Sequence, residues 1–556
     1  MKKKTSFVIL FLITAFGFIL RWLNITQYNI YSDSYEFLLL AKNLVERLSL
    51  DGSLGKNGMY WGPLFYNRVG WAMFLAPIYA LFKNLELSAH ILSLAAGILA
   101  VPAVYLLTTI LFKKREIGLI AALFLAVSFG NVMLSGFIMG NSLVVLFIIL
   151  SLVCFFKAQE NNKLLWYIIA GIILAITCFL RIELLITLPT FLIFIIGKEK
   201  FWPKLVSFLV SFVIFSGFLL FIFFRLLSEF SLWWQNQSIY IFKSVGRYGF
   251  IVLIFMLVFT LLVFLLKKKK DWFLVKSQKF YSILIILSLL LCFVIPLIAR
   301  QVYNWSASWF TLKTDFLMII LGFVGLIILF KKDFWKGLFF YLFIYPLLFI
   351  YFAFGGGGDF RHINILSPVL IILAALGTWQ ILISLKGWLK TKEGFSYKFF
   401  LTGILLIIGL VFYGQLYQNL RPWHSYISYE KEEGLTLKKI MAEKNIPSDA
   451  ILISAYPEAH YLYTGLSTWE QRKEKPFIDD SIAGHQKIIL LVDEATRDQY
   501  PALAILAENK LKPYSLKYIL PTVQYQYGSH AWWPKRLATV YYLKAGEIRK
   551  IEISDR

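Results

Sequence analysis

Long runs of apolar residues, separated by short polar segments, fill the first 420 positions of this 556-residue chain. A helix that crosses a membrane needs about 20 mainly apolar residues. The runs therefore predict an α-helical polytopic membrane protein of about thirteen transmembrane helices. The predicted spans are 5–24, 87–112, 117–137, 142–157, 164–180, 184–197, 204–227, 248–266, 280–298, 312–330, 337–354, 364–385 and 398–416.

Residues 25–86 interrupt this series with shorter patterns. The apolar run 71–83 is too short for a span, and we interpret it as an interfacial or re-entrant helix. Residues 34–48 are expected to form an amphipathic helix with one apolar face: Phe37, Leu38, Ala41, Leu44 and Val45. Two helices lying on the membrane surface would frame a cavity there.

The pattern changes again after residue 416, where alternating and helical stretches replace the long apolar runs. Helices are predicted at 430–445 and 493–509, and strands at 450–455, 487–492 and 539–544. The chain therefore divides into a transmembrane domain, residues 1–416, and a small soluble α/β domain, residues 417–556.

Composition and charge fix the expected orientation. The chain is 59% hydrophobic and only 16% charged, which excludes an ordinary soluble enzyme. Its net charge is +24, but residues 421–556 hold 19 basic and 17 acidic side chains, so the excess belongs to the apolar part. We therefore expect no nucleic-acid partner.

Basic clusters between spans mark the cytoplasmic side. The protein is expected in the plasma or inner membrane, with its N-terminus in the cytoplasm and its C-terminal domain outside.

Polar side chains gather at the predicted outer ends of the spans and in the outer loops. A proton or ion transporter would instead need charges near the middle of the bilayer. A site at the outer surface suits a substrate with a lipid tail and a charged head. The residues are Asp33, Glu36, Asn141, Arg181, Glu183, Arg225, Lys243, Arg247, Arg300, Lys313, Asp315, Asp359, Arg361 and His362.

Asp33 follows the first span, in the segment Tyr31–Glu36. A carboxylate at this place can act as a general base on an acceptor hydroxyl or amine. The alternative is a structural role, in which Asp33 or Ser32 caps the following helix with Glu36 near its third position. The two roles are compatible.

Two arginine-containing segments are candidates for phosphate binding. Arg181 and Glu183 join two spans, and Arg binds phosphate with two parallel hydrogen bonds. The alternative is an internal Arg–Glu pair. Further along, Gly355–Gly358 precede Asp359, Arg361 and His362, where backbone N–H groups at a helix start favour an anion. The alternative there is a flexible loop with an arginine reaching to the membrane surface.

Four segments in this order resemble the GT-C glycosyltransferases that use polyprenyl-phosphate sugars, and most closely their protein O-mannosyltransferase and lipid A aminoarabinose transferase branch. They are Tyr31–Ala41, Leu134–Leu146, Gly171–Glu183 and Arg361–Pro368. The resemblance covers about residues 1–420, and a C-terminal domain outside the cytoplasm is also usual for this branch.

The resemblance implies an inverting transfer of a sugar from a polyprenyl phosphate to a protein, lipid or glycan acceptor. Asp33 would be the catalytic residue, and Arg181, Arg361 and His362 would bind the donor phosphate. Supporting candidates are Tyr35, Glu36, Asn141, Glu183 and Asp359.

The segments depart from the family pattern at three places. Ser34 stands where an acidic residue often follows Asp33, Asn141 and Ser142 stand where many relatives have an acid, and Ile182 replaces a common proline. These departures leave open the second acid and the involvement of a divalent metal, and they prevent naming the sugar or acceptor. The oligomeric state has no sequence signal.

Two other function classes share the membrane topology. A flippase or exporter of lipid-linked glycans would need charged or broken helices along a path through the bilayer. A polymerase or ligase of such glycans would place its large loop late in the chain, whereas here it follows the first span.

Overall fold

The computed structural model describes residues 3–25, 32–50, 69–196, 200–226, 305–353, 364–388, 429–454, 456–470, 487–492, 515–519 and 537–544. The chain forms two compact units. Unit 1 comprises residues 1–26, 89–225 and 230–421, and unit 2 comprises residues 27–88, 226–229 and 422–556. The first outer segment of the sequence prediction thus shares a unit with the C-terminal region.

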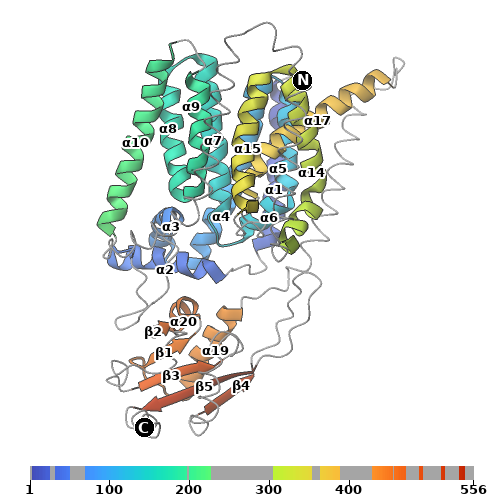
Figure 1. Ribbon diagram of the computed structural model, residues 1–556. Helices are drawn as coiled ribbons and strands as arrows, with labels where there is room; N and C mark the ends of the chain where they lie inside the picture. Colours follow the sequence, from blue (N-terminus) through green and yellow to red (C-terminus); the bar gives the residue numbers. More distant parts are fainter. Residues whose placement is uncertain are drawn as a thin grey trace. The chain divides into compact units, whose positions relative to one another are not determined.

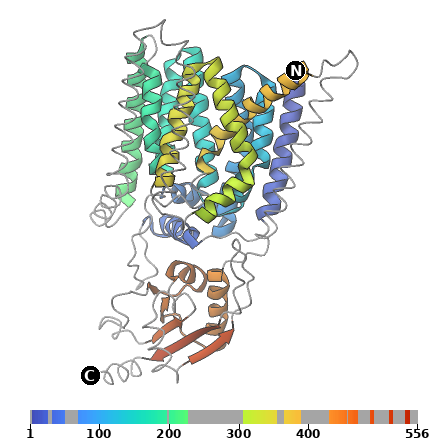
Figure 2. The same cartoon turned by 45° about the vertical axis from the view of Figure 1, so that its right-hand side comes forward.

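Unit 1 is a bundle of apolar helices that run side by side (Figures 1 and 2). Five described helices are long and apolar enough to cross a membrane, or six if one bent pair counts as a span, and shorter apolar helices accompany them. The predicted spans 248–266, 280–298 and 398–416 lie outside the described residues, so the count of thirteen stays a prediction. The bounds are α1 Lys3–Ile25, α4 Leu85–Phe112, α5 Arg115–Val127, α6 Phe129–Gly136, α7 Asn141–Asn161, α8 Leu164–Leu180, η2 Ile182–Thr187, α9 Leu188–Ile196, α10 Phe201–Leu226, α14 Trp305–Lys332, α15 Phe334–Ala353, η6 Asn364–Leu366 and α17 Ser367–Trp388.

The sequence prediction is wrong for one span. We expected a single helix over 117–137, but α5 and α6 meet at Ser128 with a bend of 52°. The Ser128 N–H donates to the carbonyl of Phe124, and the Ser128 carbonyl accepts from Val132, so the two helices are linked without being continuous. The apolar pattern runs through the bend and therefore gives no sign of it.

Small residues and aromatic rings pack the bundle. A Cβ on Gly171 of α8 would lie 2.4 Å from the Phe208 carbonyl of α10, and one on Gly325 of α14 would lie 1.8 Å from the Leu373 carbonyl of α17. Such contacts bring helix backbones together where lipid provides no hydrophobic driving force. The rings of Phe155, Phe191 and Phe339 join α7, α9 and α15 at centroid distances between 4.8 and 5.7 Å.

Unit 2 contains two helices of the first outer segment, α2 (Ser32–Arg47) and α3 (Val69–Phe82). Its C-terminal part has a five-stranded sheet of order β2-β1-β3-β5-β4 with helices α19 and α20. Strand β1 is parallel to β2 and β3, whereas β5 is antiparallel to β3 and β4. The bounds are α19 Tyr429–Glu443, β1 Ile451–Ser454, α20 Pro457–Thr464, β2 Thr468–Glu470, β3 Lys487–Val492, β4 Ser515–Ile519 and β5 Leu537–Lys544.

The core of this C-terminal part lies between the sheet and α19. Leu437 of α19 packs with alternating strand residues that include Leu452, Ile489, Leu491 and Val540. Figure 1 shows α19 and α20 on one side of the sheet. The helix predicted at 430–445 and the three predicted strands are confirmed in the structure. The helix predicted at 493–509 lies outside the described residues.

Candidate active site

Asp33 is the second residue of α2, which begins at Ser32. The helix therefore starts two residues earlier than the sequence suggested, and Asp33 occupies its first turn instead of preceding it. A negative charge is favoured at this end of a helix by the helix dipole. The structural role considered for Asp33 and the catalytic one remain compatible at this position.

The helix that carries Asp33 is buried on all sides over its first half. Tyr35 and Glu36 are 2% and 8% exposed, and Phe37 through Ala41 are also buried. One apolar face was expected, but α3 contacts one side, where Phe37 and Trp71 pack with ring centroids 5.7 Å apart. Another side meets α20, where the rings of Tyr35 and Tyr463 pack edge to face at 6.0 Å. The long helix α2 is therefore held between two neighbours.

Arg181 lies directly after α8, in extended backbone conformation. Its N–H donates to the Thr177 carbonyl, and its own carbonyl accepts from Leu184 at the start of η2. The side chain of Arg181 is only 3% exposed, whereas Glu183 is half-buried. A buried guanidinium needs hydrogen-bond acceptors or an anion around it.

A second buried arginine, Arg21, was not among the candidate residues of the sequence analysis. Arg21 of α1 is fully buried. Its guanidinium donates to the carbonyls of Leu125 and Ala126, which end α5, and to the Ser135 hydroxyl of α6. The charge of Arg21 was visible in the sequence, since a charge inside an apolar helix is costly and rare. Its partners on α5 and α6, however, lie more than 100 residues away.

A polar cluster links α6 to the start of α17. The Asn131 side-chain amide donates to the hydroxyls of Ser128 and Ser367, and its carbonyl oxygen accepts from the Ser367 hydroxyl. The amide of Asn364, two positions after His362, approaches the same oxygen at 3.5 Å. Sequence reasoning missed this cluster, because short polar side chains inside apolar runs give little pattern.

Some of the remaining candidate residues lie in the described part of the two units, and others lie outside the residues that the structure describes. Asn141 begins α7 in unit 1 and is buried. Its neighbour Ser142 donates to the Ser135 hydroxyl that Arg21 also contacts. Asp359, Arg361 and His362 lie outside the described residues. The structure thus shows Asn141 beside the Arg21 network, and describes Arg181 and α2 each within its own unit.

A divalent metal was left open from the sequence. Within the described part of the chain, no group of three His, Cys, Asp or Glu side chains is arranged to hold one. The residue that follows Asp33 is Ser34, and the next acid in the sequence is Glu36.

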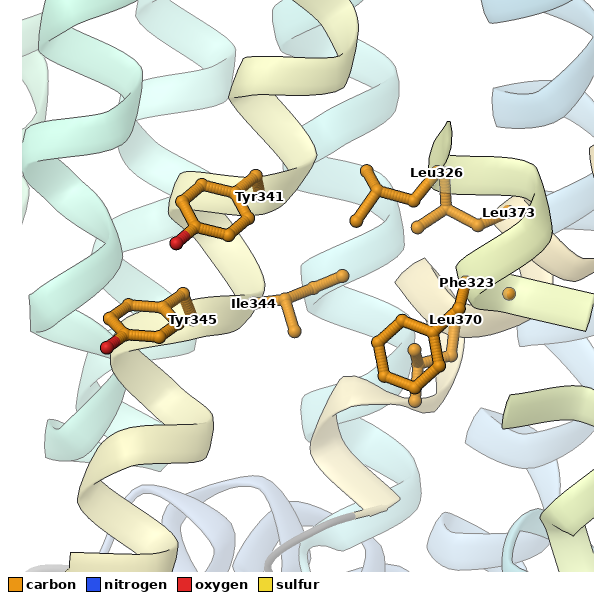
Figure 3. Close-up of a pocket in the computed structure, with 8 residues that line it drawn as sticks. Phe323, Leu326, Tyr341, Ile344, Tyr345, Leu370 and Leu373 are labelled. Carbon is orange, nitrogen blue, oxygen red and sulfur yellow. The ribbon is translucent and has the colours of Figure 1, made fainter. Parts of the chain in front are cut away.

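An apolar crevice opens between α14, α15 and α17 (Figure 3). Tyr341, Ile344 and Tyr345 of α15 face it from one side, and Phe323, Leu326, Leu370 and Leu373 from the other. Its volume of about 10 Å³ is roughly what one water molecule needs. The crevice is therefore too narrow for an isoprenoid chain unless these side chains move apart.

Residues 69–226 match the model of the dolichyl-phosphate-mannose-protein mannosyltransferase family. The match extends from α3 to α10 and includes Asn141, Arg181 and Glu183, but it begins after Asp33. No curated protein sequence matches the chain.

Two solved structures resemble the whole architecture. One is the archaeal oligosaccharyltransferase AglB from Archaeoglobus fulgidus, in complex with an inhibitory peptide and a dolichol-phosphate. It is 14% identical, with a TM-score of 0.53 over 95% of this chain and 74% of that chain. The other is ArnT from Cupriavidus metallidurans bound to undecaprenyl phosphate, 12% identical, with a TM-score of 0.53 over 95% of this chain and 97% of that chain.

The chain has the GT-C fold. The resemblance stated from four sequence segments is thereby confirmed at the level of the fold, and the family match over residues 69–226 agrees with it. Within the GT-C fold, the matched region carries the buried Arg181, while the acidic segment with Asp33 stands at the start of α2.

Proposed function

We propose that this protein transfers a sugar from a polyprenyl-phosphate donor to a protein, lipid or glycan acceptor at the outer face of the membrane, with inversion at the anomeric carbon. The observation that carries the proposal is the GT-C fold, shared with one structure holding dolichol-phosphate and another holding undecaprenyl phosphate. The match of residues 69–226 to a family named for dolichyl-phosphate-mannose supports the same donor class.

Asp33 acts as the general base in this proposal. Its carboxylate takes the proton from the acceptor hydroxyl or amine as that group attacks the anomeric carbon. The bond between this carbon and the phosphate oxygen breaks, and its electron pair stays on the polyprenyl phosphate. Attack from the side opposite the leaving group inverts the configuration. The burial of α2 supports the assignment, because a fixed helix holds a base within reach of its proton.

Arg181, Arg361 and His362 bind the donor phosphate. Negative charge grows on this phosphate as the sugar departs, so cationic donors fixed before the reaction lower the barrier. The burial of Arg181 supports its role, because a guanidinium with little exposure to water interacts strongly with an anion. Tyr35, Glu36, Asn141, Glu183 and Asp359 are the supporting residues in this proposal.

The test is an assay of the purified full chain with undecaprenyl-phosphate and dolichyl-phosphate sugars, in which a membrane extract supplies acceptors. The release of free polyprenyl phosphate is the readout, and the anomeric configuration of the product reports inversion. Asp33→Asn should lower kcat at least about a hundredfold, the usual contribution of a general base. Glu46→Gln is the matched control, since Glu46 lies on the same helix and is exposed; it should retain wild-type kcat.

Arg181→Gln should lower kcat/KM by about a hundredfold, in line with the loss of one charge-stabilising donor. Lys163→Gln is its control, because Lys163 lies at the opposite end of α8 from Arg181 and is exposed. An Asp33→Asn protein that folds and transfers at the wild-type rate would remove Asp33 from the mechanism. Movement of the donor across a liposome membrane without release of polyprenyl phosphate would contradict the proposal and favour a flippase.

A further inference from the structure

Helix α20 of the C-terminal region packs against α2, the helix whose first turn contains Asp33, although the two helices are far apart in sequence. Arg47 of α2 donates to the Tyr461 hydroxyl, 414 residues away, with a distance of 3.4 Å. Lys42 lies 4.6 Å from the centre of the Tyr461 ring, and Leu39 packs against Tyr461 in a buried cluster. Both helices belong to unit 2.

The contacts follow one face of α2. Tyr35, Leu39 and Lys42 are spaced by four and three residues, so they project from the same side of the helix. Tyr35 meets Tyr463, and Leu39 and Lys42 meet Tyr461. Residue Phe37, on another side, meets Trp71 of α3. Because a 16-residue helix is only marginally stable alone in water, its neighbours determine where it lies.

An ion-paired cluster reinforces the contact. Glu86, at the start of α4, accepts a hydrogen bond from the Tyr463 hydroxyl at 2.6 Å and pairs with Lys431 of α19 at 2.6 Å. The Lys431 and Glu86 side chains are only 15% and 28% exposed, so water screens this pair less than a fully exposed one. The cluster joins the first outer segment to both C-terminal helices.

Helix α20 is itself firmly held within the C-terminal region. His460 is fully buried; its Nδ1 is hydrogen-bonded to the Ser454 hydroxyl of β1, and its Nε2 lies 3.2 Å from a carboxylate oxygen of Glu433 in α19. Gly434 of α19 packs so closely on Tyr463 that a Cβ there would lie 3.0 Å from the tyrosine Cβ. The tyrosines that meet α2 are therefore presented by a rigid support.

We propose that the C-terminal region positions the catalytic helix, with Tyr461 and Tyr463 as positioning residues for Asp33. This inference rests on the proposed function for its consequence, since a displaced α2 moves the general base away from the acceptor. The C-terminal region thereby takes part in catalysis, because its helix α20 holds α2 on one side while α3 holds α2 on another. A misplacement of about 1 Å can cost on the order of a hundredfold in rate.

The test uses charge reversal in the purified full chain. Lys431→Glu places two acids together and should open the contact, and Glu86→Lys should do the same from the other side. Both single variants should raise hydrogen exchange of the α2 backbone amides about tenfold and lower kcat about tenfold, with KM for the donor within about twofold. The double variant, which restores an opposite pair, should recover both readouts.

Lys487→Glu is the matched control, because Lys487 pairs with Asp449 at 3.1 Å in the same C-terminal region and away from α2. It should leave exchange of α2 and kcat unchanged. Tyr463→Phe keeps the ring against Tyr35 and loses the hydrogen bond to Glu86, and it should show a smaller effect than Tyr463→Ala.

The two proposals fail in different ways. Unchanged exchange of α2 in Lys431→Glu, with transfer by the wild type intact, would overturn the positioning role and leave the proposed function standing. A double variant that recovers neither readout would also overturn it. The opposite outcome is also possible: hydrogen exchange of α2 rises in the single variants, but the wild type transfers no sugar from any polyprenyl phosphate. That result would refute the proposed function and leave the docking of α2 by α20 in place.

Discussion

Replacing Arg21 by methionine should destabilise the helical bundle strongly. The guanidinium of Arg21 donates at 3.0 Å to the carbonyls of both Leu125 and Ala126 in the last turn of α5. These carbonyls lie in the last turn of the helix, because α5 ends at Val127 and the chain bends at Ser128. The guanidinium thus takes the place of the N–H groups that a continuous helix would provide, and its positive charge suits a helix C-terminus.

The size of the effect follows from the groups left without partners. A buried acceptor that loses its donor costs about 1–3 kcal/mol, so two carbonyls correspond to about 2–6 kcal/mol. Removing the buried charge offsets part of this, because desolvating a guanidinium costs several kcal/mol. The carbonyls of Leu125 and Ala126 gain no relief from solvent, since both residues are fully buried and water cannot replace the lost donor. The stability of Arg21→Lys should lie between those of the wild type and Arg21→Met, because one ammonium cannot reach both carbonyls and the Ser135 hydroxyl.

The assay is thermal unfolding of the purified protein in one detergent at one scan rate. At about 2 °C per kcal/mol, Arg21→Met should melt about 4–12 °C below the wild type. Arg225→Met is the matched control, since it makes the same exchange at an exposed position of α10 and should change Tm little. A Tm for Arg21→Met equal to that of Arg225→Met would refute the reasoning and show that the two carbonyls find other donors.

Two further predictions come from the packing of each unit. Gly171→Ala should destabilise the bundle by about 1–3 kcal/mol, because its Cβ would meet the Phe208 carbonyl; Gly217→Ala, with no atom within 4 Å of the new Cβ, should melt at or above the wild-type Tm. Burial, followed by the nearby Tyr35 and Glu86, raises the pKa of Tyr463 above its usual 10.0. The neutral phenol therefore stabilises the fold below pH of about 10, and this contribution is lost as the pH rises further. The Tm gap between wild type and Tyr463→Phe should thus narrow between pH 8 and pH 11, and a constant gap would contradict the assignment.

Much of the fold was predictable because apolar patterns are local. The runs at 87–112 and 204–227 correspond to α4 and α10 within a few residues, and the strand predicted at 487–492 is β3. The functional resemblance was also visible, since Tyr31–Ala41 and Gly171–Glu183 stand in the order typical of polyprenyl-phosphate glycosyltransferases. Gly171 additionally has a packing reason that the sequence did not reveal, because its partner Phe208 lies on another helix.

The bend at Ser128 was not predictable, since apolar residues continue through 117–137 and no proline marks the break. Its stabilising group, Arg21, was visible as a charge in an apolar helix, but its acceptors were not. The same holds for α2, where one apolar face was expected and burial on several sides was found.

The sequence alone determined where most of the described helices lie and which residues carry charge into apolar surroundings. These properties depend on neighbouring residues and on the free energy of placing each side chain in water or lipid. The tertiary structure decided which groups form hydrogen bonds with those charged side chains and which helices pack against α2. Contacts such as Tyr35 with Tyr463, or Arg21 with Ala126, join positions more than 100 residues apart, and no local pattern encodes a partner at that separation.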